Sequence, residues 1–249
     1  MWSQKQLDSI FARTGLAPPS AFLEAAKVMR SEIPSLFEGG DAAADQCDAL
    51  YFHNTYGEIL GDLPLVEIGF LPFWQENNHC ETVLIGCRAP FVGCVGAFGI
   101  LAHEQGGLIS GNFADFFALL KRQIADHPDE SPLLSELISA CAYSGTFPVE
   151  VTQYADARIR KYRAEGDGRQ LSFYGAMSEE LSLELLASDD FFDVEVAARR
   201  LAGIRSKKAI PALQRLAAQT APRGMVDQHF RAAQKALRCI KGEATQRRS

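Results

Sequence analysis

Residues 63–87 have the sequence LPLVEIGFLPFWQENNHCETVLIGC, and this stretch decides the fold class of the chain. Its two apolar parts, residues 63–73 and 81–87, are rich in Val, Ile, Leu and Phe, a composition that favours strands. Between them, residues 75–78 are polar and predict a turn. The stretch therefore predicts two strands of an antiparallel sheet.

The sheet is expected to continue beyond this stretch. Residues 91–101 are again apolar and predict more strand, which Gly93, Gly96 and Gly99 weaken or bend. We expect two to four antiparallel strands in residues 49–110.

Amphipathic helices are predicted on either side of the strands. Apolar residues at helical spacing lie in residues 7–11, and Pro18 and Pro19 suit the first turn of a second helix. After the strands, Asn112 is a good N-cap for a helix over residues 113–124, whose Phe, Leu and Ile residues share one side. This later helix is expected to pack on one face of the sheet.

Further along the chain, helices dominate. Ser131 and Pro132 predict the start of one helix, and residues 152–164 predict a charged helix. Residues 165–168, with the sequence EGDG, break the charged helix. They mark the predicted boundary between two parts of the chain.

An internal repeat of 36 residues follows this boundary. Two helical segments carry apolar residues at matching positions, and a third helix over residues 208–218 lies between them. The matched positions are Val194 and Phe230, Ala197 and Ala233, Leu201 and Leu237, and Ile204 and Ile240. Helix pairs that repeat at this length stack on neighbours, because one pair cannot cover its own apolar face.

Residues 193–216, with the sequence DVEVAARRLAGIRSKKAIPALQRL, resemble a HEAT repeat. The resemblance rests on the alanine pair of the first helix, on the short turn and on the segment AIPAL that opens the second helix. It extends over residues 178–240 and implies a helical binding surface. Because so few repeats seldom stand alone, this part is expected to pack on the N-terminal part.

The first 126 residues resemble the SUKH superfamily of Smi/Knr-type domains. The resemblance rests on GLAPPSAFL at residues 15–23, VEIGF at 66–70, ETVLI at 81–85 and LISGNFADFFALL at 108–120. It implies an α+β domain that is commonly a bacterial immunity protein, which binds and neutralises a toxin. The family has no accepted catalytic residues to carry over to this chain.

We therefore expect an α+β fold, in which an antiparallel sheet with flanking helices is followed by an all-α, HEAT-like helical extension. Three parts are predicted along the chain. They are a SUKH-like domain in residues 1–126, a helical connector in residues 127–168 and the extension in residues 169–249.

Composition narrows the class of function. The chain has 249 residues, 47% of them hydrophobic, which is enough to bury a sizeable core. A net charge of −6 disfavours binding of nucleic acid or anionic membrane through the whole surface and suits a basic protein partner. Neither a membrane span nor a secretory signal is predicted, so the expected compartment is the cytoplasm. No oligomeric state is predicted.

The cysteines and histidines predict neither a metal site nor catalysis. Cys80, Cys87 and Cys94 are seven residues apart, whereas zinc ligands pair at shorter spacing. His79 and Cys80 are adjacent, so on a strand they point to opposite faces and do not form a nucleophile–base pair. We expect reduced, metal-free thiols and no cofactor.

A candidate partner-binding surface brackets the first two predicted strands. Four acidic residues surround two aromatic ones there, which suits a basic partner because aromatic residues anchor interfaces and charges steer the encounter. These residues are Asp62, Glu67, Phe73, Trp74, Glu76 and Glu81. The alternative is a solvated turn with Trp74 in the core.

The favoured hypothesis is a protein-binding module of an immunity or regulatory type, which occludes a partner such as a basic toxin domain. A scaffold or adaptor that binds through the HEAT-like helices is the first alternative. An enzyme that uses a cysteine or a histidine is the second, and it needs such residues to converge in a cleft. No catalytic, cofactor-binding or metal-binding residue is predicted.

Overall fold

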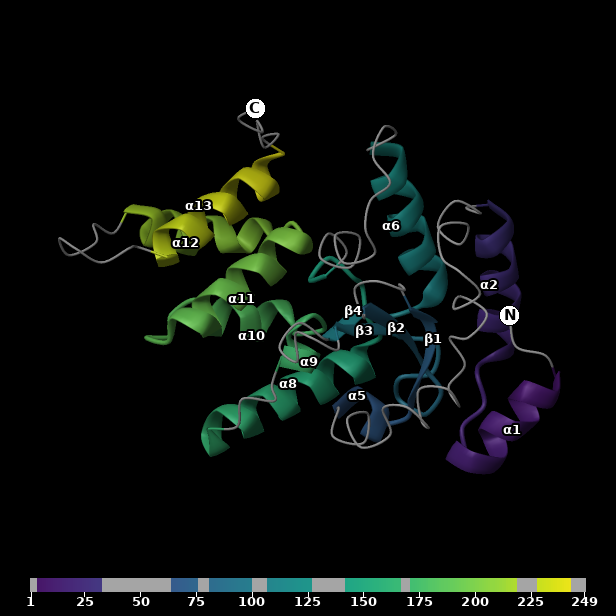
Figure 1. Cartoon of the computed structure of the whole chain (residues 1–249). Helices are drawn as coiled ribbons and strands as arrows, with labels where there is room; N and C mark the ends of the chain where they lie inside the picture. The colour runs from purple at the N-terminus through teal and green to yellow at the C-terminus, as the bar shows by residue number, and fades with distance from the viewer. Residues whose placement is uncertain are drawn as a thin grey trace.

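A four-stranded antiparallel sheet lies at the centre of the fold (Figure 1). The computed structural model describes residues 4–32, 64–75, 81–99, 107–126, 142–166, 171–218 and 228–242. The strands follow chain order across the sheet and are β1 (Phe70–Gln75), β2 (Glu81–Gly86), β3 (Val95–Gly99) and β4 (Gly107–Ser110). Each neighbouring pair is antiparallel. The predicted α+β fold with a helical extension is confirmed.

Two predicted strands are shorter in the structure. In the predicted strand 63–73, Pro64–Glu67 instead forms a turn of helix, α5, because proline suits the first turn. Gly69, with a φ of 102°, then redirects the chain into β1. In the predicted strand 91–101, residues 91–94 form a tight turn after β2, and β3 begins only afterwards.

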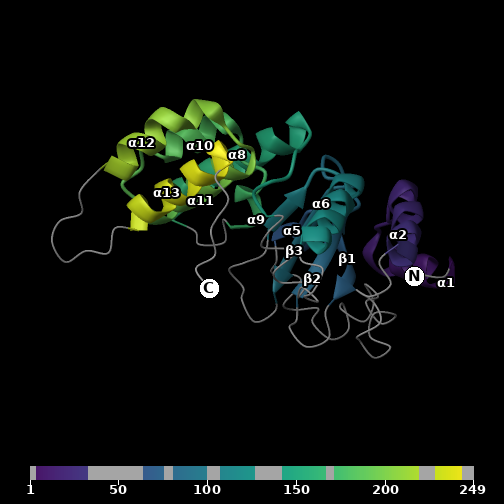
Figure 2. The same ribbon diagram turned by 90° about the horizontal axis from the view of Figure 1, so that it is seen from above.

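Three helices share an apolar cluster with one face of the sheet, which we call the outer face (Figures 1 and 2). They are α1 (Gln4–Thr14), α2 (Ser20–Glu32) and α6 (Phe113–Asp126), and α2 and α1 lie toward the β1 edge. Asn112 caps α6 as predicted, since its Oδ1 accepts a hydrogen bond from the Asp115 N–H at 2.8 Å. The face is apolar on both sides, with Leu71, Val83, Ile85, Val95, Ala97 and Ile109 meeting Ile10, Phe22, Met29, Phe113, Phe116 and Leu120. The predicted packing of α6 on one face is confirmed.

The opposite, inner face of the sheet continues into the C-terminal helices (Figure 2). Its residues Phe70, Leu84 and Leu108 share one apolar cluster with α5, α8 (Val149–Glu165) and α9 (Leu171–Tyr174). The same cluster runs on through the helical extension. The extension comprises α10 (Glu179–Leu185), α11 (Phe191–Gly203), the 3-10 turn η3 (Lys207–Ala209), α12 (Ile210–Ala218) and α13 (Gln228–Lys241).

The repeated helices pack on each other as expected. α13 contacts both α11 and α12, and the matched alanines Ala197 and Ala233 are fully buried. The matched leucines differ, because Leu201 is fully buried and Leu237 is only partly buried. Within the described residues, each repeated helix packs mainly on two other helices. These are α10 and α13 for α11, and α11 and α12 for α13.

The extension shares its core with the sheet. α8 ends at Gly166, which has a φ of 69°, so the predicted helix break is confirmed. The apolar cluster nevertheless continues past this break in both directions. A Cβ atom on Gly203 of α11 would lie 2.3 Å from the Tyr143 carbonyl oxygen, so this close approach requires glycine. The expectation that the extension packs on the N-terminal part is confirmed.

A buried arginine ties the extension to the segment that follows the sheet. Arg200 of α11 is 5% exposed. Its Nε donates to the Met177 carbonyl oxygen at 2.9 Å, and its Nη1 donates to those of Tyr143 and Gly145 at 2.8 Å each. Burial lowers the pKa of the guanidinium to about 10, so the group is still charged at neutral pH. Three backbone carbonyl groups accept hydrogen bonds from this charged group, the centroid of the Phe147 ring lies 5.7 Å from the guanidinium carbon, and the Asp156 carboxylate also favours the charged form.

Candidate functional site

The two aromatic residues of the predicted surface belong to the core. Trp74 is 5% exposed and lies in the apolar cluster of the outer face. Phe73 is partly buried, and its ring meets those of Phe22 and Phe113 edge-on, with centroid distances of 4.8 and 5.6 Å. The alternative that places Trp74 in the core is the one observed. Neither ring is an exposed anchor, because both belong to the apolar cluster in which α2 and α6 pack against β1.

The acidic residues of that surface are described only in part. Glu67 is exposed on α5. Glu81 opens β2, but its side chain, like Asp62 and Glu76, lies outside the described part of the chain. Of the four acidic residues, Glu67 is thus the one whose exposed carboxylate is seen in the described part of the chain.

Two of the three described thiols, Cys87 and Cys94, are poor nucleophiles, whereas the third, Cys239 of α13, is exposed. Cys94 is buried and its thiol donates to the Gly111 carbonyl oxygen at 3.4 Å, while Cys87 is partly buried with its Sγ 3.4 Å from the Ile85 carbonyl oxygen. Burial raises the pKa of each thiol to about 12, so both are protonated at neutral pH. Cys80 lies outside the described residues. Within those residues, no three His, Cys, Asp or Glu side chains gather as a metal site would require.

Several segments converge at the end of the sheet where β1 begins and β4 ends. The Cys94 thiol reaches the Gly111 carbonyl, and the Gly111 N–H donates to the Thr146 carbonyl oxygen at 2.8 Å. The Phe91 ring meets the Tyr154 ring edge-on at 5.0 Å. The turn after β2, the residues before α6 and the residues before α8 are thereby held together.

Exposed apolar side chains lie on these converging segments. Val92 is 54% and Val149 is 62% exposed, which makes them two of the five large apolar side chains exposed in the described residues. The other exposed residues on these segments and on α5 are charged or small and apolar. We define the sheet-end surface as the exposed residues Glu67, Arg88, Ala89, Pro90, Val92, Pro148, Val149 and Glu150.

The sequence hypothesis included only Glu67 of this surface. Val92 was expected within a strand, and Val149 precedes the predicted helix 152–164. A proline stands within two residues before each valine, and prolines mark the edges of regular elements. These prolines are the feature of the sequence that indicates that neither valine lies in the interior of a helix or strand.

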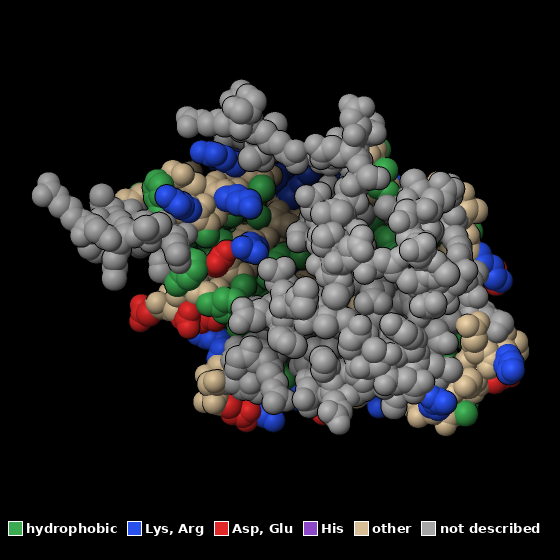
Figure 3. Space-filling model, viewed as in Figure 1, with side chains coloured by type: hydrophobic (Ala, Val, Ile, Leu, Met, Phe, Trp, Pro, Cys, Tyr) green, Lys and Arg blue, Asp and Glu red, His purple; other side chains and the backbone are tan. Residues whose placement is uncertain are grey.

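Charge is divided unevenly along the chain. Residues 196–249 contain thirteen Lys and Arg residues and two acidic ones, Asp227 and Glu243, whereas residues 1–195 contain twelve basic and twenty-nine acidic residues. In Figure 3, Lys and Arg side chains gather over α12 and α13. Asp and Glu side chains lie below them in this view, over α10 and α11. The overall charge of −6 conceals this division.

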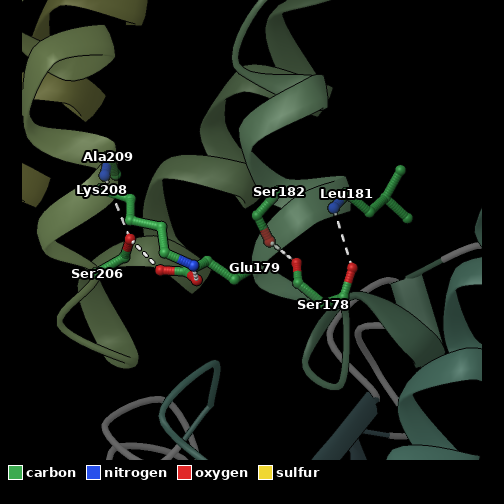
Figure 4. Close-up of polar contacts among 7 residues, drawn as sticks. All are labelled: Ser178, Glu179, Leu181, Ser182, Ser206, Lys208 and Ala209. Atoms are coloured by element: carbon green, nitrogen blue, oxygen red, sulfur yellow. Dashed lines mark hydrogen bonds and ion pairs between the residues drawn. The ribbon is translucent and has the colours of Figure 1, made fainter.

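Polar contacts lie at the start of α10 and at the start of η3, where the Ser206 hydroxyl is beside the Glu179 carboxylate and Ser178 caps α10 (Figure 4). The Ser206 hydroxyl donates to Glu179 Oε1 at 2.6 Å and accepts from the Ala209 N–H at 3.2 Å. Lys208 Nζ binds Glu179 Oε2 at 2.7 Å, and these contacts from Lys208 and Ser206 lower the pKa of Glu179. The Glu179 carboxylate is therefore ionised at neutral pH and already bound by Lys208 and Ser206. It is not placed to activate the Ser206 hydroxyl as a nucleophile. The contacts thus cap helices rather than catalyse.

The described helices include none with the length and apolarity that crossing a bilayer requires. A functional assignment depends on the surfaces and side-chain environments of the chain itself. Comparisons with protein-family models, with curated proteins and with solved structures found no match to this chain.

Proposed function

We propose that this protein is a protein-binding module of the immunity or regulatory type, which works in the cytoplasm and occludes a partner such as a basic toxin domain. The observation that carries the proposal is the sheet-end surface, where exposed valines lie among charged residues. The resemblance of residues 1–126 to the SUKH superfamily supports it, because such domains commonly bind and neutralise toxins.

The composition of the sheet-end surface suits a protein partner. Specific interfaces combine an apolar centre with a polar rim. Val92 and Val149 supply the apolar centre, and Glu67, Arg88 and Glu150 supply charged residues around it. The segments that carry the valines are tied by backbone hydrogen bonds, so little conformational entropy is lost on binding.

Charge favours a basic partner for this part of the chain. The excess of acidic residues in 1–195 attracts a basic protein during diffusion and raises the association rate. Thiol catalysis is disfavoured at Cys87 and Cys94, because burial raises the pKa of both thiols to about 12.

The test is a binding measurement with matched variants. The full chain captures its partner from the source organism, and association and dissociation rates are then measured for the purified pair. The double variant V92Q/V149Q should raise Kd at least tenfold, mainly through faster dissociation, because interface contacts act on the off-rate. The control V28Q changes a valine on α2 that is 46% exposed and should alter Kd less than twofold.

Two outcomes would reject the proposal. The first is an unchanged Kd for V92Q/V149Q, in which case binding elsewhere, for example through α10–α13, favours the adaptor alternative. The second is turnover of a metabolite by the purified chain with no captured protein, which favours an enzyme. Reversing the charge at Glu67 and Glu150 should slow association, and this effect should shrink as salt rises.

A further inference from the structure

Among the residues that the structure describes, the helical extension carries exposed cations without an acidic partner. Across the described residues, many exposed ion pairs neutralise local charge, as in Arg160 with Glu184, Arg199 with Glu195 and Lys208 with Glu179. In the same described part of the chain, no ion pair involves the exposed residues Arg205, Lys207, Arg215, Arg231, Lys235, Arg238 and Lys241. We call the three of them that share one side of α13, namely Arg231, Lys235 and Arg238, the basic face.

The cations of α13 form a stripe opposite its buried side. Arg231, Lys235 and Arg238 are three or four residues apart, so they share one side of the helix over about 10 Å. Ala233 and Ala236, on the other side, are at most 2% exposed where α13 packs on α11 and α12. The packing of the extension therefore directs the stripe into solvent, and Figure 3 shows Lys and Arg side chains gathered over these helices.

The composition around the basic face favours nucleic acid over an acidic protein or an anionic membrane as its ligand. In the described residues of 205–242, no large apolar side chain is exposed. Protein interfaces need apolar or aromatic anchors, and helices that bind membranes insert an apolar side. A phosphate backbone needs only cations, and protein–nucleic acid interfaces are more positive than protein–protein ones.

We propose that the basic face binds the phosphate backbone of nucleic acid, without dependence on base sequence. This binding is independent of the proposed partner at the sheet-end surface. The overall acidity of the chain does not prevent it, because charges beyond about 8 Å are largely screened at physiological ionic strength. Cations that contact phosphates release condensed counterions, so affinity falls steeply with salt.

The experiment measures binding of the full chain to a fluorescent 20-base-pair DNA duplex of random sequence and to a single-stranded RNA, from 50 to 200 mM salt. The variant R231E/K235E/R238E should weaken binding at least tenfold and reduce the slope of log K against log salt by about 3 for the duplex. The control K5E/K27E/R122E makes the same change in net charge on α1, α2 and α6, and it should alter affinity less than threefold. Equal melting temperatures exclude unfolding as the cause.

Three results would overturn the proposal. They are no binding to either nucleic acid at 50 mM salt, equal losses in the variant and the control, and binding to polyglutamate or to phosphatidylserine vesicles at least as tight as to nucleic acid. Either form of the last result assigns the face to an acidic protein or to a membrane. Partner binding through the sheet-end surface should be unchanged in R231E/K235E/R238E, so the two proposals fail separately.

Discussion

The two faces of the sheet are covered in different ways. On the outer face, α1, α2 and α6 meet the strands through apolar side chains. On the inner face the apolar cluster continues into the extension, where buried polar groups join it, namely Ser182, Asp193, Arg200 and Ser206. An apolar pattern is sufficient to place helices on the outer face, whereas the orientation of the extension is also set by directed hydrogen bonds.

The buried polar groups of the extension are satisfied by specific partners. Asp193 accepts one hydrogen bond from the Ser188 hydroxyl at 2.8 Å and pairs with Arg163 at 2.7 Å, and the pair with Arg163 ties α11 to α8. Arg200 binds carbonyls on both sides of α8 in sequence. Such contacts favour a single arrangement, because other arrangements would leave buried polar groups without partners.

The largest expected effect lies on the outer face. Changing Trp74 to alanine should lower the free energy of unfolding by about 3–5 kcal/mol, because it removes a buried aromatic side chain. The matched control is Phe11→Ala, since Phe11 is 57% exposed and should cost about 0.5 kcal/mol or less. Urea denaturation measures both values. A Trp74→Ala protein of nearly normal stability would mean that Trp74 is an interface residue.

On the inner face, Arg200→Leu should cost about 3 kcal/mol, because three carbonyl oxygens lose a charged donor in a buried site. Its neighbour gives a close comparison. Arg199→Leu removes an exposed arginine that pairs with Glu195, and it should cost about 0.5 kcal/mol or less. Equal losses at the two positions in urea denaturation would show that the buried hydrogen bonds do not hold the extension.

The repeat itself is tested by its two matched leucines. Leu201→Ala should cost about 3 kcal/mol, and Leu237→Ala about half as much, because only Leu201 is fully buried. The same denaturation experiment applies. Equal costs would mean that Leu237 is as deeply buried as Leu201, with a further layer of side chains that covers α13.

The smallest effect concerns pH. Burial raises the pKa of Cys87 and Cys94 from 9.0 to about 12, so the unfolded chain loses these protons at lower pH than the folded one. Stability that is fully present below pH 9 should therefore fall as the pH rises toward 12. The double variant C87A/C94A should show a shallower decline in urea denaturation between these values. An identical pH dependence would contradict the burial of the thiols.

The sequence predicts the antiparallel sheet, the helix α6 and the helical extension, because each has a hydrophobic pattern of its own period. It misplaces the start of β1 because Pro64 and Gly69 override a run of strand-forming residues. It leaves Trp74 either as an exposed anchor or in the core, because composition does not specify which side of an edge strand is covered. The sheet-end surface depends on contacts between residues 91–94, 111 and 146, which no local pattern encodes.

Native-state hydrogen exchange tests most directly whether the extension and the sheet are one cooperative unit. Amides of α11 and β4 should exchange with the same free energy of opening, since one apolar cluster contains both and Arg200 hydrogen-bonds to Gly145, whose backbone lies against Ile109 of β4. In the Arg200→Leu protein, the amides of α11 should lose more protection than those of the outer-face helix α6. Exchange of the whole extension at a much lower free energy than β4 in the unchanged protein would contradict the account.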